Sequence, residues 1–190
     1  MKRLFGWPYK AILAGLYRTG IRPWQLTMLS LALNLSAGVL LVRGERFLPA
    51  ALLVPAGLAD VFDGSIARLR GQDKRSGAFM DSVLDRVADA AVFACLFWSL
   101  ARQGDHLDAA LALVTLIVTL MVSHLRAEAE AAGITLSEGL FQRLERYIVT
   151  ILGLAIPGGL RPVLFLLAGL GTVTVLQRGW SAGRRLSVRA

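Results

Sequence analysis

This chain of 190 residues carries little charge and almost no cysteine. Only 18% of its residues are charged and 55% are hydrophobic, whereas soluble globular domains are about 25% charged and about 45–50% apolar. The single cysteine, Cys95, cannot form a disulfide framework. These shortages exclude an ordinary soluble fold, a disordered chain and a disulfide scaffold, and they favour a protein that lies in a membrane.

The length leaves no room for a second domain. A membrane span needs roughly 20 residues, so about six spans with short loops would use nearly the whole chain. Six apolar segments are separated by short stretches rich in glycine, proline and charge. These segments are residues 23–42, 47–69, 77–100, 107–126, 140–156 and 162–180. We therefore expect one all-α integral membrane domain over residues 1–190, with a six-helix bundle over residues 23–182.

The first 21 residues differ from these spans, because basic side chains alternate with apolar and aromatic ones. This pattern predicts an amphipathic helix at the membrane interface, ahead of the bundle. A cleaved signal peptide fits less well, since Lys10 interrupts the apolar stretch and no small-residue cleavage site follows.

The formal net charge of +8 indicates either a nucleic-acid partner or a membrane surface. With six spans, sixteen of the 21 Lys and Arg residues fall on one side of the membrane and four on the other. The positive-inside rule makes the basic side cytoplasmic. The sequence thus predicts no nucleic-acid partner and a multi-pass protein of the cell (inner) membrane, with both termini on the cytoplasmic face.

Five aspartates interrupt the second and third spans. An Asp at the centre of a span costs about 2.5–3.5 kcal/mol, so five that faced lipid would cost roughly 15 kcal/mol. Their spacing of three or four residues places each set on one face of a helix, and the two faces can converge on one pocket. The aspartates are Asp60, Asp63, Asp81, Asp85 and Asp89.

Three uses of such a cluster are open on composition alone. Carboxylates without neighbouring His or Cys form a hard oxygen site that suits Mg²⁺ or Mn²⁺. The acids could instead pair with Arg68 and Arg86 in structural salt bridges, or form the relay of a small proton or ion transporter.

The spacing of this stretch favours the metal site. It reads Asp60-Val-Phe-Asp63-Gly64-Ser-Ile-Ala67-Arg68, then Gly77, Asp81 and Asp85. This resembles the signature of the CDP-alcohol phosphotransferase family, D-x2-D-G-x2-A-R-x8-G-x3-D-x3-D, with every fixed position filled. A transporter would explain the acids but not the glycines, the alanine and the arginine at their spacing.

The resemblance implies an enzyme that displaces CMP from CDP-diacylglycerol and joins the phosphatidyl group to an alcohol. It implies two Mg²⁺ ions, with Mn²⁺ as a substitute, held by Asp60, Asp63, Asp81 and Asp85, and it gives Asp85 the further role of catalytic base. It also favours a homodimer. The residues implied to bind the CDP-lipid are Trp24, Gln25, Leu26, Thr27, Asp60, Gly64, Arg68, Lys74 and Gly77.

Four arginines at the cytoplasmic span ends suit an acceptor alcohol that carries its own phosphate. Ordinary positive-inside topology is the alternative reading of these residues. They are Arg126, Arg143, Arg146 and Arg178.

Two further stretches resemble the inositol-phosphate branch of the family. One is Asp85-Arg86-Val-Ala-Asp89, and the other runs from Ser123 to Gly133 and continues at Gln142. Three residues depart from that branch, because Arg126 replaces a usual Lys, Glu128 a usual Arg and Gln142 a usual Glu. We expect 1D-myo-inositol 3-phosphate as the acceptor, with phosphatidylinositol phosphate as product. Glycerol 3-phosphate, the acceptor of phosphatidylglycerophosphate synthases, is the alternative.

Overall fold

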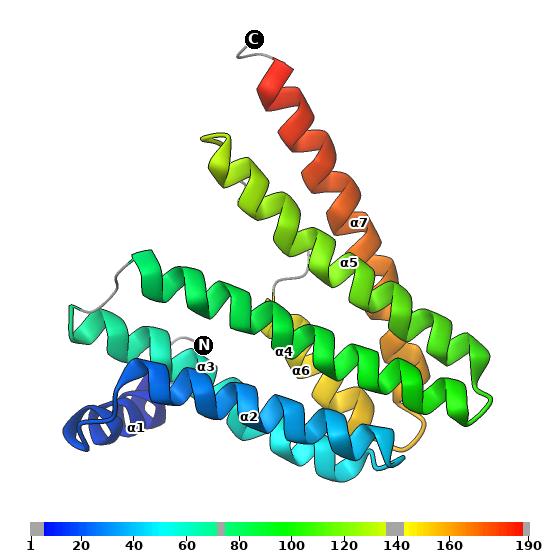
Figure 1. Ribbon diagram of the computed structural model, residues 1–190, viewed down its shortest axis with the longest axis horizontal. Helices are drawn as coiled ribbons and strands as arrows, with labels where there is room; N and C mark the ends of the chain where they lie inside the picture. The colour runs from blue at the N-terminus through cyan, green and yellow to red at the C-terminus, as the bar shows by residue number, and fades with distance from the viewer. Residues whose placement is uncertain (1–5, 72–74, 136–142, 188–190) are drawn as a thin grey trace.

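The computed structural model describes residues 6–71, 75–135 and 143–187, and these residues form helices joined by short turns, without a strand. Figure 1 shows the seven helices in chain order. They are α1 (Gly6–Arg18), α2 (Pro23–Val42), α3 (Phe47–Leu69), α4 (Arg75–Arg102), α5 (His106–Ala131), α6 (Arg143–Ala155) and α7 (Leu160–Ser187). The all-α expectation is confirmed.

Local sequence signals set the helix ends. The first helical residue of α2 is Pro23, whose missing N–H would have had no helical partner. The backbone N–H of Arg22 donates to Gln25 Oε1 at 2.8 Å. Helix α2 stops before Gly44 and α5 before Gly133, which have φ values of 85° and 73°. Glycine adopts this left-handed conformation without steric cost, so the chain can turn sharply at both places.

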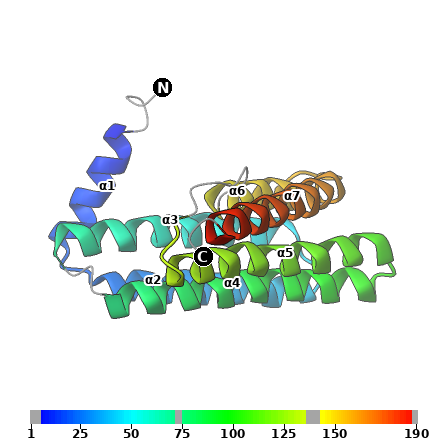
Figure 2. The ribbon, with the colours of Figure 1, turned by 90° about the horizontal axis from the view of Figure 1, so that it is seen from above.

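Six of the helices form a closed ring. Around it, α2 packs on α3, α3 on α6, α6 on α7, α7 on α5, α5 on α4, and α4 on α2. Helix α1 contacts only α3 among the described helices and extends away from the ring, as Figures 1 and 2 show. Tyr9 of α1 stacks on Phe62 of α3 with ring centroids 5.3 Å apart.

The apolar core fills one end of this ring. Its most buried side chains come from the end of α2, the start of α3, the end of α4 and the start of α7, and they are Leu41, Leu53, Leu96, Leu100 and Leu164. Helices approach closely where glycine faces them: a Cβ at Gly57 would lie 2.7 Å from the Tyr147 ring. Small residues of this kind allow close helix packing in membranes.

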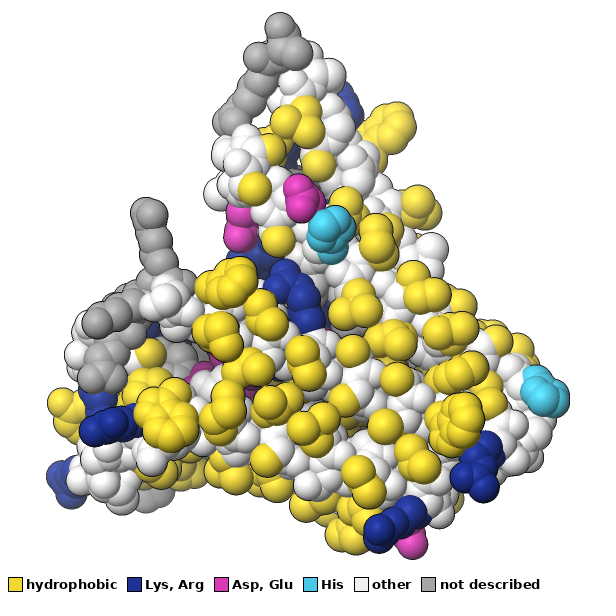
Figure 3. All heavy atoms as spheres, viewed as in Figure 1, with side chains coloured by type: hydrophobic (Ala, Val, Ile, Leu, Met, Phe, Trp, Pro, Cys, Tyr) yellow, Lys and Arg dark blue, Asp and Glu magenta, His cyan; other side chains and the backbone are white. Residues whose placement is uncertain are grey.

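Four helices are long and apolar enough to cross a membrane: α2, α3, α5 and α7. Hydrophobic side chains also cover much of the face in Figure 3, and several are largely exposed, including Phe47, Leu176 and Trp180. The four long apolar helices and this exposed apolar surface together indicate a multi-pass membrane protein. Helix α4 differs because it carries four charged residues in its first half, and α6 because it has 13 residues.

A helix covers each predicted span, with some shifted boundaries. Helix α5 continues to Ala131 and α7 to Ser187, beyond the predicted ends at 126 and 180. Our prediction stopped these spans at charged or aromatic residues, but Ala and Glu after Arg126 have good helix propensity and prolong the helix. Residues 140–142 of the fifth predicted span lie outside the described part of the chain.

Candidate active site

Three carboxylates converge across a gap between α3 and α4. These two helices do not pack directly on each other in the described part of the chain. Nevertheless, Asp60 and Asp63 of α3 and Asp81 of α4 place carboxylate oxygens within 4.8 Å of one another. The i, i+3 spacing turns both α3 acids to one face, and the ring geometry directs that face toward α4. The predicted convergence of two acidic helix faces is confirmed for these three residues.

The surroundings of this group fit a divalent cation. Asp63 is 4% exposed, and its Oδ2 accepts a hydrogen bond from Thr27 Oγ1 at 2.7 Å. Asp81 Oδ1 is buried and has no hydrogen-bond partner among the described residues. Buried carboxylate oxygens need a compensating partner. An all-oxygen donor set of this kind suits Mg²⁺ or Mn²⁺.

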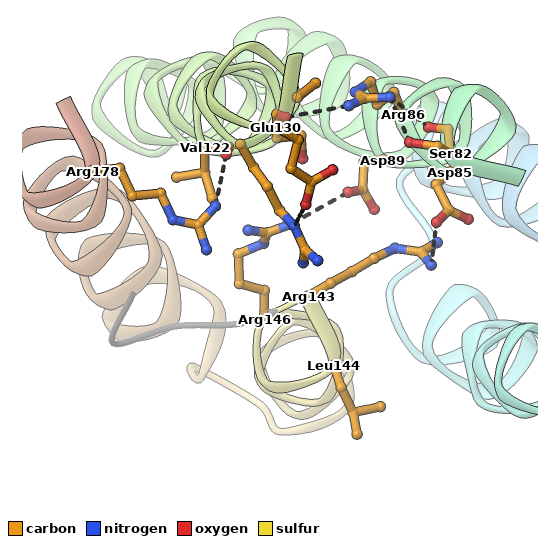
Figure 4. A pocket seen from close by; sticks show the side chains of 13 residues that line it. Ser82, Asp85, Arg86, Asp89, Val122, Glu130, Arg143, Leu144, Arg146 and Arg178 are labelled. Carbon is orange, nitrogen blue, oxygen red and sulfur yellow. Dashed lines mark hydrogen bonds and ion pairs between the residues drawn. The ribbon is translucent and has the colours of Figure 1, made fainter. Parts of the chain in front are cut away.

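Asp85 lies beside this group but has a different partner. Its Oδ2 is 2.7 Å from Nη1 of Arg143, and the same nitrogen is 2.7 Å from Oδ2 of Asp60. Figure 4 shows the Arg143 side chain extended from α6 toward Asp85. One arginine therefore joins an acid of α3 to an acid of α4.

A cavity of about 600 Å³ opens next to Asp85, between α4, α5, α6 and α7. All four arginines expected to bind an acceptor phosphate line it: Arg126, Arg143, Arg146 and Arg178. Positive-inside topology would have put these residues on one side of the membrane without bringing them into one cavity. With Arg86 the lining carries five arginines against three acids, Asp85, Asp89 and Glu130, so the cavity has a positive balance and can hold an anion.

Neighbouring groups already hold the other three expected arginines in place, and Figure 4 labels two of them, Arg146 and Arg178. Arg126 Nε donates to Glu130 Oε1 at 2.9 Å, and Arg146 Nη2 lies 3.7 Å from Asp89 Oδ2. Arg178 is 7% exposed and donates to the backbone carbonyl of Val122 at 2.8 Å. These contacts orient the positive charges toward the space between the helices.

Comparison with known proteins agrees with this geometry. The model of the CDP-alcohol phosphatidyltransferase family matches residues 21–176. The chain belongs to this family. It is accordingly a transferase, and the transporter alternative does not hold.

Similar members of the family are phosphatidylinositol phosphate synthases. The chain is 34% identical over 172 residues to the one from Corynebacterium glutamicum, covering 86% of this chain and 78% of the relative. It is 34% identical over 173 residues to the one from Mycobacteroides abscessus, covering 87% and 79%. The resemblance stated from the sequence is confirmed.

Two solved structures of the Mycobacterium tuberculosis phosphatidylinositol phosphate synthase resemble this fold. The structure with CDP-DAG bound superimposes with a TM-score of 0.82, at 30% identity and 92% coverage of each chain. The structure in complex with manganese and citrate has a TM-score of 0.83, at 30% identity, and covers 92% of this chain and 88% of that one.

This CDP-alcohol phosphatidyltransferase leaves space beside the two signature glycines. A Cβ at Gly77 would meet nothing within 4 Å, and one at Gly64 would meet only Arg68 Nη1 at 3.6 Å. Arg68 itself donates to Ser65 Oγ at 3.3 Å. A ligand can thus approach the backbones of α3 and α4 closely at these positions. Lys74, which is also expected to bind the CDP-lipid, lies outside the described residues.

The start of α2 contributes four expected CDP-lipid residues with four different environments. Trp24 is 58% exposed, whereas Leu26 is buried against α3. Gln25 caps the helix, and Thr27 donates a hydrogen bond to Asp63 of the three-carboxylate group. Of the four, Thr27 is the one that the structure connects directly to the carboxylate group.

Sequence reasoning missed the contacts of Arg86 and Asp89. Salt bridges of the acids with Arg68 or Arg86 were one alternative, but Arg86 bonds Ser82 Oγ at 2.8 Å and the Ser123 carbonyl at 3.2 Å. It thereby ties α4 to α5. Asp60, Asp85 and Asp89 pair instead with arginines of α6, which are distant in sequence. Only the bond between Arg86 and Ser82 had a local signal in the sequence, which is their i, i+4 spacing.

Proposed function

We propose that this transferase moves the phosphatidyl group from CDP-diacylglycerol to 1D-myo-inositol 3-phosphate, with phosphatidylinositol phosphate and CMP as products. The observation that carries the proposal is the placement of a three-carboxylate group directly beside a cavity lined by five arginines. The names of the relatives and the CDP-DAG complex of the mycobacterial synthase support both substrates.

In this proposal, Asp60, Asp63, Asp81 and Asp85 hold two divalent ions. Bound Mg²⁺ or Mn²⁺ would neutralise the charge on the diphosphate as the phosphoryl group is transferred. The manganese complex of the mycobacterial synthase supports this choice of metal. The CDP-lipid would contact Arg68, Gly64 and Gly77 along the open side of α3 and α4.

Asp85 is the proposed base because it borders both the carboxylate group and the cavity. The acceptor hydroxyl oxygen attacks the β-phosphorus, which carries diacylglycerol, and the bond from that phosphorus to the oxygen of CMP breaks. The hydroxyl proton moves to a carboxylate oxygen of Asp85. Position decides this role, since a base must lie within hydrogen-bond reach of the proton that it takes.

The basic cavity suits an acceptor that carries a phosphate. Arginine binds phosphate through two parallel N–H···O bonds, and five arginines border the cavity. Glu128 was the departure that placed the acceptor in doubt, because an arginine is usual there. Its side chain is 67% exposed and does not line the cavity in the described structure. This placement supports inositol phosphate despite the substitution.

The proposed topology is one domain over residues 1–190 with six spans, in which α4 and α6 cross the membrane as members of the ring of helices. Pairing of their charges with one another supports this arrangement, since Asp85 and Asp89 of α4 contact arginines of α6. Helix α1 would lie at the cytoplasmic interface. Exposure of Lys10 and Arg18 beside the apolar contact of α1 with α3 supports that placement. The homodimer stays a prediction.

CMP release tests the proposed function. Purified protein with Mg²⁺ and CDP-diacylglycerol should release CMP when 1D-myo-inositol 3-phosphate is added, and chelation of the metal should stop the release. Glycerol 3-phosphate and free inositol serve as matched acceptors. Release with glycerol 3-phosphate alone would overturn the acceptor, and no release with any acceptor would overturn the proposed reaction.

A further inference from the structure

Arg143 occupies the position between two acids that belong to the proposed metal site. Its Nη1 lies 2.7 Å from Asp60 Oδ2 and 2.7 Å from Asp85 Oδ2. The two carboxylates come from helices that do not pack on each other, and Arg143 comes from a third helix, α6. In this arrangement a protein cation neutralises and joins the acids.

One donor of the Arg143 guanidinium is left unsatisfied. Its Nε is buried without a hydrogen-bond partner among the described residues. A guanidinium has five N–H donors, and a buried donor that is left unpaired is unfavourable. The same side chain also lines the basic cavity, so a ligand there could bond the donors that the acids leave unused.

We infer that Arg143 is a displaceable counter-ion: a divalent ion replaces it between Asp60 and Asp85, and the released side chain then binds the acceptor phosphate. This inference deepens the proposed function and rests on it. Mg²⁺ binds carboxylate oxygens at about 2.0–2.1 Å. An ion bound to both oxygens would lie close to Nη1. The two cations would then compete for the same pair of oxygens and repel each other, so Arg143 would have to leave.

The cavity provides the second position for Arg143. It is lined by Arg146 and Arg178, and two of its carboxylates, Asp89 and Glu130, already pair with Arg146 and Arg126, so a third guanidinium there gains from an added anion. An acceptor phosphate supplies that anion and forms paired N–H···O bonds with arginine. Metal binding would therefore favour acceptor binding by freeing Arg143, and acceptor binding would favour metal binding by holding Arg143 away from the acids. Such coupling is reciprocal by thermodynamic necessity.

Manganese binding measures this coupling without catalysis. Full-length protein in detergent is titrated with Mn²⁺, and the free ion is measured by electron paramagnetic resonance, without CDP-lipid and with or without myo-inositol 3-phosphate. A protein-free titration corrects for Mn²⁺ held by the acceptor itself. In the wild type, the acceptor should tighten Mn²⁺ binding about tenfold, within the range of about 5–150-fold that is typical of coupled sites.

Arg143→Gln should bind Mn²⁺ more tightly than the wild type in the absence of acceptor, by roughly the same tenfold factor, because no cation has to leave. The acceptor should then have almost no effect on Mn²⁺ affinity. Arg143→Lys restores a displaceable charge and should return the affinity toward the wild-type value. Unfolding midpoints with saturating Mn²⁺ show whether each variant is folded.

Arg126→Gln is the matched control, since Arg126 lines the same cavity but pairs with Glu130. Its Mn²⁺ affinity without acceptor should equal that of the wild type. A folded Arg143→Gln protein with unchanged or weaker Mn²⁺ affinity would overturn the inference. CMP release by the wild type is measured in the same preparation. Absence of CMP release by the wild type, together with tighter Mn²⁺ binding by Arg143→Gln, would overturn the proposed function and leave the counter-ion role standing.

Discussion

The two ends of the helix ring are held together in opposite ways. At the end that contains the turns at 43–46 and 103–105, leucine and alanine side chains fill the space between neighbouring helices. At the other end, α3 and α4 stand apart, and the space between helices holds carboxylates, arginines and a cavity of about 600 Å³. Packing stabilises the first end, whereas charge pairing stabilises the second.

This difference shows how a small bundle can hold charged substrates in a membrane. The packed end sets the helix directions, so the opposite ends can separate without loss of the ring. The separated ends need polar contacts, and Arg143 and Arg146 supply them to three acids. A ligand can replace such contacts, whereas a packed core cannot be replaced.

The largest effect is expected from an acid at the charged end. Asp85→Asn should lower turnover by about 10²–10⁴-fold, since an amide cannot accept the acceptor proton. Binding of CDP-DAG, measured by calorimetry, should be largely retained. Asp60→Ala should instead weaken binding of Mn²⁺ and CDP-DAG together, because Asp60 belongs to the carboxylate group.

A matched acid at the packed end provides the control for Asp85→Asn. Asp108 also lies 2.7 Å from an arginine, Arg161, but it is far from the carboxylate group along the helices. Turnover per folded Asp108→Asn molecule should equal that of the wild type. Normal turnover by Asp85→Asn would remove Asp85 from the role of base.

The packed end is tested by Leu164→Ala, which removes a fully buried side chain of α7. The cavity left behind should lower the free energy of unfolding by about 2–5 kcal/mol. Turnover per folded molecule should change little, and thermal unfolding measures the stability. Leu176→Ala on the same helix is the control, because Leu176 is 67% exposed. Equal destabilisation by the two variants would contradict the placement of the core.

A smaller effect is expected from the cavity wall. Arg178→Ala should raise the acceptor KM by about 10–100-fold, the equivalent of a charge-assisted hydrogen bond worth about 1.5–3 kcal/mol. The KM for CDP-DAG should stay unchanged. Arg184→Ala, further along the exposed end of α7, should leave both constants alone. An unchanged acceptor KM would show that Arg178 does not bind the acceptor and that its role is the hydrogen bond to the Val122 carbonyl.

The smallest effect concerns the orientation of a single acid. Thr27→Val removes the hydroxyl that bonds Asp63 at 2.7 Å. Loss of one hydrogen bond worth about 0.5–1.5 kcal/mol should weaken Mn²⁺ binding by about two- to tenfold. Thr27→Ser keeps the hydroxyl and should restore the wild-type affinity. Equal affinities for the valine and serine variants would show that Thr27 does not orient the acid.

Much of the charged end could be predicted from sequence because its residues follow helical periodicity. Asp60 and Asp63 share a face of α3, and the spacing of Asp81 and Asp85 does the same on α4. The partners of these acids could not be predicted in this way. Arg143 lies 83 residues beyond Asp60 in the chain, and local patterns carry no information about such a pairing. Pairs with Arg68 and Arg86, the alternative that the sequence left open, involved the nearest arginines in the chain, whereas the structure pairs Asp60 and Asp85 with Arg143.

The sequence by itself determined that this chain is helical and apolar, and that its acids lie on two helix faces. Hydropathy and helical spacing are local properties, so the order of residues is enough to define them. Only the tertiary structure decided that α3 and α4 stand apart and that one arginine of α6 lies between their acids. It also gathered five arginines into one cavity. These features depend on how distant helices pack, which is decided by the shape and charge of the assembled bundle.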